Sequence, residues 1–161
     1  MASDPGVQAL PGLRSRGKRN EAVQRWQMDN GGRGLYDLTP KLQEWLEEVR
    51  AGEGWVNLFV PHTSASLLLQ ENADPDVQRD ILDYFARMVP DGDPGFRHRN
   101  EGPDDMSAHL RSALTQNSLI IPVREGRAGL GGWQGVFLFE HRVRPVSRRV
   151  LVSFQGVAKE V

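Results

Sequence analysis

Hydrophobic residues recur with a helical period in three stretches of the chain. The first stretch lies between Thr39-Pro40, a typical helix start, and Gly52, a typical residue just past a helix end. Its apolar residues fall at i, i+3, i+4 and i+7, and they are Leu42, Trp45, Leu46 and Val49. This spacing predicts an amphipathic helix that packs on a core.

Two further helices are predicted in the middle of the chain. One begins at Asp74-Pro75, a cap followed by proline, and ends at Pro90. Its apolar stripe consists of Ile81, Leu82, Phe85 and Met88. The other runs from about Asp104 to Leu114, and its helically spaced set is Met106, His109, Leu110 and Ala113.

The remaining hydrophobic segments are rich in strand formers. They span residues 22–28, 55–69, 118–123, 134–143 and 148–157. The turn Asn30-Gly31-Gly32 is typical of a β-hairpin. Hairpin-like strands with inserted helices predict an α+β fold, in which a mixed or mainly antiparallel sheet, shaped as a sandwich or half-barrel, carries about three helices.

The chain has 161 residues, which fits one compact domain. Residues 1–20 hold several prolines, glycines and basic residues and few that could build a core, so we expect a flexible tail before a domain at 21–161. The basic run in this tail fits a solvated segment or, alternatively, an arm that binds polyanions.

Charge and composition narrow the function classes. The formal net charge is −1, which predicts neither nucleic-acid nor anionic-membrane binding. The chain lacks cysteine, so a transition metal would need His, Asp or Glu ligands. We find no apolar run of membrane-spanning length and no signal-peptide pattern. A soluble, cytoplasmic protein is the expectation.

Three of the four histidines fall on faces predicted to point inward. His62 shares strand parity with Val56, Leu58 and Val60, and His141 shares it with Phe137 and Phe139, while His109 lies on the apolar face of the third helix. A single inward histidine is more often a satisfied core residue. Three from separate elements favour a shared site, because one divalent metal can satisfy three imidazoles at once. Zinc, magnesium and manganese all stay open as its identity.

Other polar residues are candidates around this metal. Asp105 is the i+4 neighbour of His109 and could reach the same ion or position the ring, and Glu71 could orient an imidazole. Asp74 is explained as a helix cap. His98 lies in a polar loop and is either an exposed residue or a mobile acid or base beside the cleft.

A glycine-rich segment at residues 125–135 is the second notable feature. Five glycines allow backbone N–H groups to approach an anion, although the segment by itself is typical of a flexible hairpin loop. Arg127 within the segment and Arg149 further on carry guanidinium groups that suit phosphate oxygens. We therefore expect a phosphorylated small-molecule substrate.

Several short motifs, in order from Trp55 to Gly156, resemble those of the YjbQ family. They are His62-Thr63-Ser64-Ala65-Ser66, Glu71-Asn72, Asp74-Pro75, Glu101-Gly102, Asp104-Asp105-Met106 with His109, Gly126-Arg127, Gly132-Trp133-Gln134-Gly135, Glu140-His141-Arg142, Arg148-Arg149 and Gln155-Gly156. The ordered set is specific, whereas any one piece is not.

The resemblance implies a secondary thiamine-phosphate synthase, which joins hydroxymethylpyrimidine diphosphate to thiazole phosphate. It also implies a compact α+β fold, a metal held by histidines and a homotrimer. On this reading His62, His109 and His141 bind the metal and Asp105, Glu71 and His98 support catalysis. The substrate contacts would come from Ser64, Arg127, Gly132, Trp133, Gln134 and Arg149.

The sequence departs from the family at two places. Gly132 stands where threonine is usual, and Arg99-Asn100 follow His98 in place of an acidic and aromatic pair. Both departures concern substrate contacts and not the fold. Two other functions stay open: a metal-dependent phosphohydrolase, and a non-catalytic metal- or anion-binding protein.

Overall fold

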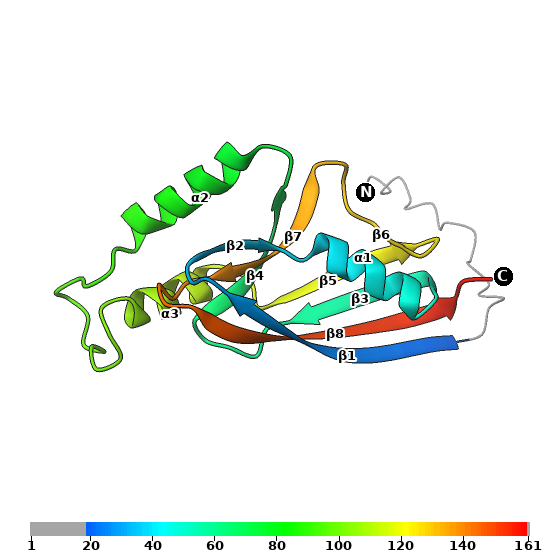
Figure 1. Cartoon of the computed structure of the whole chain (residues 1–161), viewed down its shortest axis with the longest axis horizontal. Helices are drawn as coiled ribbons and strands as arrows, with labels where there is room; N and C mark the ends of the chain where they lie inside the picture. The colour runs from blue at the N-terminus through cyan, green and yellow to red at the C-terminus, as the bar shows by residue number, and fades with distance from the viewer. Residues whose placement is uncertain (1–18, 161) are drawn as a thin grey trace, which may run out of the picture.

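Two antiparallel sheets curl around one core (Figure 1). The structure is a computed structural model that describes residues 19–160. The larger sheet has the order β1-β8-β3-β5-β6, with strands β1 (Arg19–Asn30), β8 (Val146–Ala158), β3 (Ala51–Phe59), β5 (Ser118–Arg124) and β6 (Arg127–Ala128). The smaller sheet has the order β2-β7-β4, with β2 (Gly34–Asp37), β7 (Gln134–Glu140) and β4 (Ala65–Glu71).

Three helices complete the described part of the chain: α1 (Thr39–Glu48), α2 (Pro75–Met88) and α3 (Asp105–Leu114). Every strand pairing is antiparallel. The predicted α+β fold with an antiparallel half-barrel sheet and three helices is therefore confirmed. None of these helices is long and apolar enough to cross a membrane.

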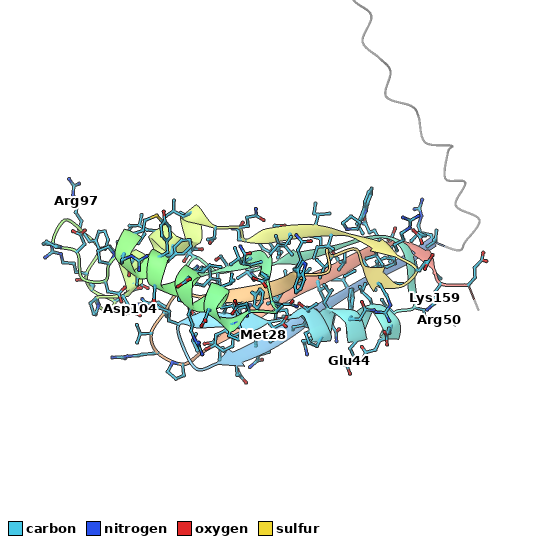
Figure 2. The ribbon with its side chains drawn as sticks, turned by 90° about the horizontal axis from the view of Figure 1, so that it is seen from above. Met28, Glu44, Arg50, Arg97, Asp104 and Lys159 are labelled. Atoms are coloured by element: carbon cyan, nitrogen blue, oxygen red, sulfur yellow. The ribbon has the colours of Figure 1, made fainter. Side chains whose placement is uncertain are left out.

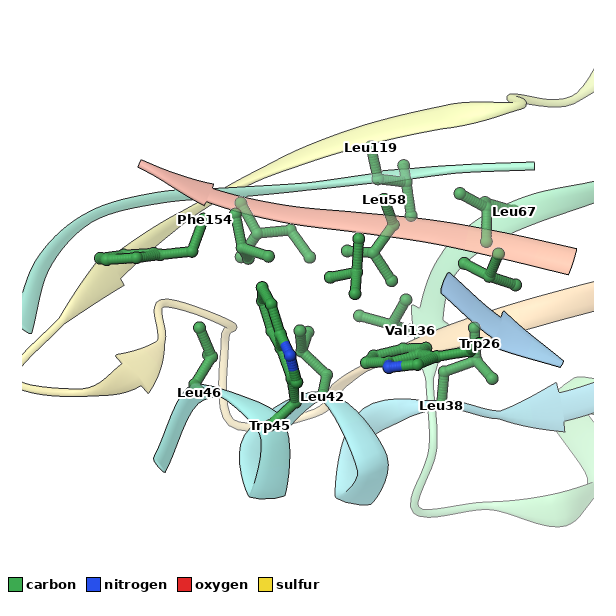
Figure 3. Close-up of a cluster of buried hydrophobic side chains, with 14 of the residues drawn as sticks. Trp26, Leu38, Leu42, Trp45, Leu46, Leu58, Leu67, Leu119, Val136 and Phe154 are labelled. Atoms are coloured by element: carbon green, nitrogen blue, oxygen red, sulfur yellow. The ribbon is translucent and has the colours of Figure 1, made fainter. Parts of the chain in front are cut away.

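The core lies between α1 and the inner faces of the sheets (Figure 3). Leu42, Trp45 and Leu46 of α1 are buried, as their helical spacing predicts. Trp45 meets Trp26 of β1 edge to face, with ring centroids 6.3 Å apart. Alternate residues of β3 and β8 complete the packing. Burial of these faces supplies most of the stabilisation of such a domain.

The start of α1 and the turn before β2 differ from the sequence expectation. Thr39 does not cap α1, because its hydroxyl accepts the backbone N–H of Val136 at 2.9 Å. The Asn30–Gly32 turn does not form a hairpin, because β1 pairs with β8 and β2 pairs with β7. The turn instead carries the chain from one sheet to the other, and Gly32 has a φ of +101° there.

Strand β7 is covered on both faces. Val136 and Leu138 belong to the central core, whereas Phe139 on the opposite face meets Phe85 of α2 with centroids 5.3 Å apart. Asp74 caps α2 as expected, accepting from the Asp76 N–H at 2.9 Å. No residue of α2 is fully buried, and the helix stands out from the sheets in Figure 1.

Helix α3 does not bury the face that its apolar spacing predicts. The buried residues are Asp105, Ser107, Ala108 and Arg111, and the His109 side chain keeps 31% of its surface exposed. The reason is a polar anchor: Arg111 donates to the carbonyl of Val89 at 2.7 Å, and Ser107 donates to Asp91. Hydrogen bonding, rather than apolar periodicity, orients this helix.

The domain starts slightly earlier than predicted, because β1 begins at Arg19 and so includes the last two residues of the expected tail. Residues 1–18, to which the prediction of a flexible tail mainly refers, lie outside the described residues.

The burial of the core residues predicts how substitutions change the stability of the protein. Leu58 of β3 is 0% exposed, so Leu58→Ala should lower the free energy of unfolding by about 2–5 kcal/mol through lost burial and a cavity. Val143 is 53% exposed, and Val143→Ala should change it by no more than about 0.5 kcal/mol. Chemical denaturation measures both. Equal losses in the two variants would contradict the described core.

Candidate functional site

Four ionisable side chains converge at the start of α3. His98, Glu101, Asp105 and His109 each offer a ligand atom, and these atoms all lie within 4.8 Å of one another. We call them the α3 cluster. The cluster lies at the end of the molecule where Asp104 and Arg97 are labelled in Figure 2, opposite Arg50 and Lys159. The loop 89–104 and the first turns of α3 bring its members together.

Asp105 is the centre of the α3 cluster. Its side chain is 2% exposed, and one carboxylate oxygen, Oδ2, lies 2.7 Å from His98 Nε2 and 3.0 Å from His109 Nε2. The other oxygen, Oδ1, accepts from the guanidinium of Arg142. Burial alone would raise the pKa of Asp105, but the hydrogen bond from His98 and the charges of Arg142 and His109 outweigh it. The pKa is lowered, and the carboxylate stays charged.

Arg142 holds the carboxylate side of the cluster in place. Its Nε donates to Asp104 at 3.1 Å and its Nη2 donates to the carbonyl of Glu101 at 2.9 Å. Asp104 also accepts the backbone N–H of Val143 at 2.8 Å. These bonds tie the loop before α3 to the segment after β7, so the ligand atoms are positioned by two distant parts of the chain.

The hydrogen bonds of His109 determine what its Nε2 must carry. Nδ1 lies 2.9 Å from the carbonyl oxygen of Thr63, which can only accept, so Nδ1 carries a proton. Nε2 faces a charged carboxylate, which also can only accept. A neutral His109 would point a lone pair at Asp105. Either a second proton or a bound cation must therefore lie on the Nε2 side.

His62 lies apart from the α3 cluster, in the connection between β3 and β4. Its Nε2 accepts the backbone N–H of Arg149 at 2.9 Å. Partial burial lowers its pKa, and the nearby charges of Arg148 and Arg149 lower it further. The ring is thus a neutral imidazole that carries its proton on Nδ1.

His141 is fully buried directly after β7. Its Nε2 lies 2.8 Å from the hydroxyl of Ser66, and its ring packs on Phe139 with centroids 4.2 Å apart. Its Nδ1 has no hydrogen-bond partner. Burial first, and the charges of Arg111, Arg33 and Arg148 next, lower its pKa to about 3. His141 is therefore neutral over the physiological range.

The three histidines predicted to share one metal do not form one group within a single chain. In the part of the chain that the structure describes, the α3 cluster is the only group of three or more potential ligands, and it contains His109 but neither His62 nor His141. His98 takes part instead. Strand parity correctly placed His141 in the interior, but α2 covers that face.

The glycine-rich segment and Glu71 lie at the far end of the smaller sheet. Glu71 pairs with Gln134, while Ala65 at the other end of β4 pairs with Glu140. Six residues of strand separate these ends by about 20 Å. Trp133 is 70% exposed, and an added Cβ at Gly132 would meet no atom within 4 Å. Gly132, Trp133 and Gln134 are thus exposed and Glu71 is half-buried, and all four are remote from the α3 cluster of the same chain.

The two predicted phosphate-binding arginines are separated as well. Arg127 opens β6 and lines a pocket of about 330 Å³ with Arg50 and Lys159, at the opposite end of the molecule from Asp104 (Figure 2). Arg149 is exposed on β8 beside His62. Only Arg149 lies near the residues around Ser64.

Sequence patterns found part of the α3 cluster. The i, i+4 spacing of Asp105 and His109 indicated their contact, which the structure shows. Glu101 and Arg142 stand out in the sequence only as parts of the motifs that resemble the YjbQ family. The Thr63 carbonyl left no sequence signal, because any residue supplies a backbone carbonyl.

Comparison with known proteins finds relatives that the chain matches over most of their length. The sequence profile of the family described as "UPF0047 protein YjbQ-like" matches residues 24–157. A UPF0047 protein of Synechocystis is 50% identical over 125 residues, covering 78% of this chain and 85% of that protein. The UPF0047 protein YjbQ of Escherichia coli is 42% identical over 125 residues, covering 77% and 90%.

Solved structures agree with this relationship. A conserved hypothetical protein of Thermus thermophilus has a TM-score of 0.72 and 39% identity, covering 80% of this chain and 97% of that chain. A hypothetical protein of Aeropyrum pernix has a TM-score of 0.77 and 29% identity, covering 84% and 98%. The chain therefore belongs to the YjbQ-like UPF0047 family.

Proposed function

We propose that this protein is a metal-dependent enzyme that acts on a phosphorylated small molecule. The observation that carries the proposal is the Nε2 of His109, which faces the Asp105 carboxylate while its Nδ1 is held as a donor by Thr63. A histidine that binds a metal typically donates its other ring N–H to a backbone carbonyl in this way. A cation between His98, Asp105 and His109 would satisfy all three side chains.

The donor set fits a divalent ion. Two imidazole nitrogens and one carboxylate oxygen suit zinc or manganese, and the exposed Glu101, whose Oε2 lies 3.8 Å from His98 Nε2, could add a second oxygen. Magnesium also accepts the two carboxylates. When bound, the ion would supply positive charge that stabilises a departing diphosphate or phosphate.

The residues of the chain itself have distinct tasks in this proposal. Arg142 keeps Asp105 ionised and fixes its orientation, and Thr63 fixes the ring of His109. Arg149, on the side of His62, is free to contact a phosphate oxygen. His98 keeps 41% of its side chain exposed, so it can meet a substrate directly.

The reaction that we propose first is thiamine-phosphate synthesis, as the family resemblance implies. The thiazole nitrogen attacks the methylene carbon of hydroxymethylpyrimidine diphosphate, a C–N bond forms, and the C–O bond to diphosphate breaks. The departing diphosphate takes the bonding electrons. Positive groups positioned in advance for this leaving group are the main electrostatic contribution that a protein makes to such a step.

A phosphohydrolase is the second candidate, and the exposure of the cluster favours it. His98 and His109 are 41% and 31% exposed, so water reaches the ligand atoms in the single chain. Water would attack phosphorus, the P–O bond to the alcohol would break, and the alcohol and inorganic phosphate would leave without any thiazole acceptor.

We also propose that the chain forms a homotrimer, as the resemblance implies. The outer face of the larger sheet supports self-association, because it exposes apolar side chains that no described element covers. These are Val23 at 80%, Trp55 at 60%, Phe59 at 37%, Ile120 at 70% and Leu151 at 37% exposure. A patch of this kind is typical of an interface. In a trimer, a glycine-rich loop that is remote from its own α3 cluster could reach that of a neighbour.

The metal site is tested with histidine variants. Purified protein should bind one divalent ion per chain, measured by calorimetry with zinc, manganese and magnesium. His98→Ala and His109→Ala should each weaken binding by more than the roughly 10- to 100-fold that losing a supporting residue costs. His62→Ala should retain binding. Unchanged affinity in His109→Ala would refute this ligand set.

The activity is tested by product formation. Metal-loaded protein should form thiamine phosphate from the two precursors, and Asp105→Asn should reduce the rate by at least about 100-fold. Arg124→Ala, on an exposed β5 position outside the cluster, should leave the rate unchanged. Inorganic phosphate released without thiazole would support the phosphohydrolase. Metal binding with neither product would indicate a non-catalytic protein.

The trimer is tested by light scattering coupled to gel filtration. The wild type should elute at three times the 18.0 kDa chain mass. Ile120→Asp should dissociate it, because the substitution places a charge in an apolar interface. Leu114→Asp, at a 59% exposed position on α3, should not. A monomeric wild type at micromolar concentration would contradict the proposal.

A further inference from the structure

A pocket of about 410 Å³ lies beside the turn between β3 and β4 and is distinct from the α3 cluster. The residues that matter to its chemistry are His62, Thr63, Ser64, Asn117 and Arg148. None of the residues that line this pocket is acidic. The pocket therefore presents hydrogen-bond donors without a competing carboxylate.

Arg148 is anchored so that one end of its guanidinium is left free. The residue is 6% exposed, and its Nε and Nη2 each donate to Glu140 at 2.7 Å. Nη2 also donates to the Ser64 hydroxyl at 2.8 Å and to the Ser64 carbonyl at 3.1 Å. Nη1 has no hydrogen-bond partner among the described residues. It is also not one of the polar atoms that are fully buried and unpaired, so part of its surface is accessible. Its two N–H groups are consequently open to the pocket.

Two further donors come from the turn itself. The Ser64 oxygen accepts from Arg148, which leaves its own O–H without an acceptor among the described residues. His62 Nε2 is occupied by the Arg149 N–H, so the proton lies on Nδ1, which also has no partner there. Three side chains thus offer unused donors, and the first of them carries a fixed positive charge.

We propose that this pocket binds the dianionic phosphate group of a phosphate monoester. A phosphate offers several acceptor oxygens and a double negative charge, which complement donors arranged around a guanidinium. The buried Glu140 neutralises part of the Arg148 charge but cannot reach the ligand, because both of its oxygens are already hydrogen-bonded to Arg148.

One residue, Thr63, connects the pocket to the α3 cluster. Thr63 lines the pocket, while its carbonyl accepts from His109. A phosphate held in the pocket would therefore be linked to the proposed metal through Thr63 and the His109 ring. That this phosphate belongs to the substrate rests on the proposed function, whereas the anion site itself does not.

The experiment measures anion binding without metal. Chelator-treated full-length protein is titrated with inorganic phosphate and with methyl phosphate by calorimetry. One site per chain should bind methyl phosphate at least as tightly as inorganic phosphate. Arg148→Lys, which keeps a charge for Glu140 but loses the free Nη1, should weaken binding about 10- to 100-fold, and Ser64→Ala about 10-fold. The matched controls Arg124→Lys and Ser147→Ala, outside the pocket, should bind as the wild type does.

Several results would overturn the proposal. These are no saturable binding, equal affinity in Ser64→Ala and wild type, or binding of inorganic phosphate alone. If Arg148→Lys fails to fold, shown by thermal unfolding, the Ser64→Ala result decides. Because no metal is present, loss of this site is distinguishable from failure of the metal site or of the synthase activity.

Discussion

The site depends on one buried ion pair. Glu140 is 0% exposed and accepts two hydrogen bonds from Arg148, one from Asn30 and one from the backbone of Arg142. A carboxylate in this position is tolerated only because each oxygen is satisfied, and removal of one partner would leave a buried charge. The pair links the end of β7 to β8, and through Ser64 it fixes the turn that precedes β4.

That turn connects the two chemical features of the molecule. Its side chains line the phosphate pocket, and the Thr63 carbonyl sets which nitrogen of His109 carries the proton. The other half of the site is the loop 89–104 between α2 and α3, which hydrogen bonds hold in place. Arg33 binds both oxygens of Asp91, at 2.8 and 2.9 Å, and donates to the carbonyl of His141 at 3.0 Å. Burial alone would raise the Asp91 pKa, but the bonds from Arg33 and Ser107 leave it lowered.

Local sequence rules predicted caps, buried faces and contacts correctly where a single helix determines them. The Asp74 cap, the buried stripe of α1 and the Asp105–His109 contact each depend on spacing within a single helix. The rules failed where two elements compete for the same group. Thr39 accepts the Val136 N–H instead of capping α1. Helix α3 buries Arg111 because the Val89 carbonyl accepts from it and Asp91 balances its charge. Strand parity identified His141 as interior, but it could not show that Phe139 and α2 would close that face.

By itself, the sequence determined the fold class, the three helices, the family and the residue types that can carry the chemistry. Hydrophobic period and ordered motifs fix these, because both are local properties of the chain. The tertiary structure decided which histidines meet. His98 and His109 share Asp105, His62 faces a separate pocket, and His141 is fully buried beside Phe139. Such convergence depends on how loops and strands from distant parts of the chain pack, and no spacing along the sequence encodes it.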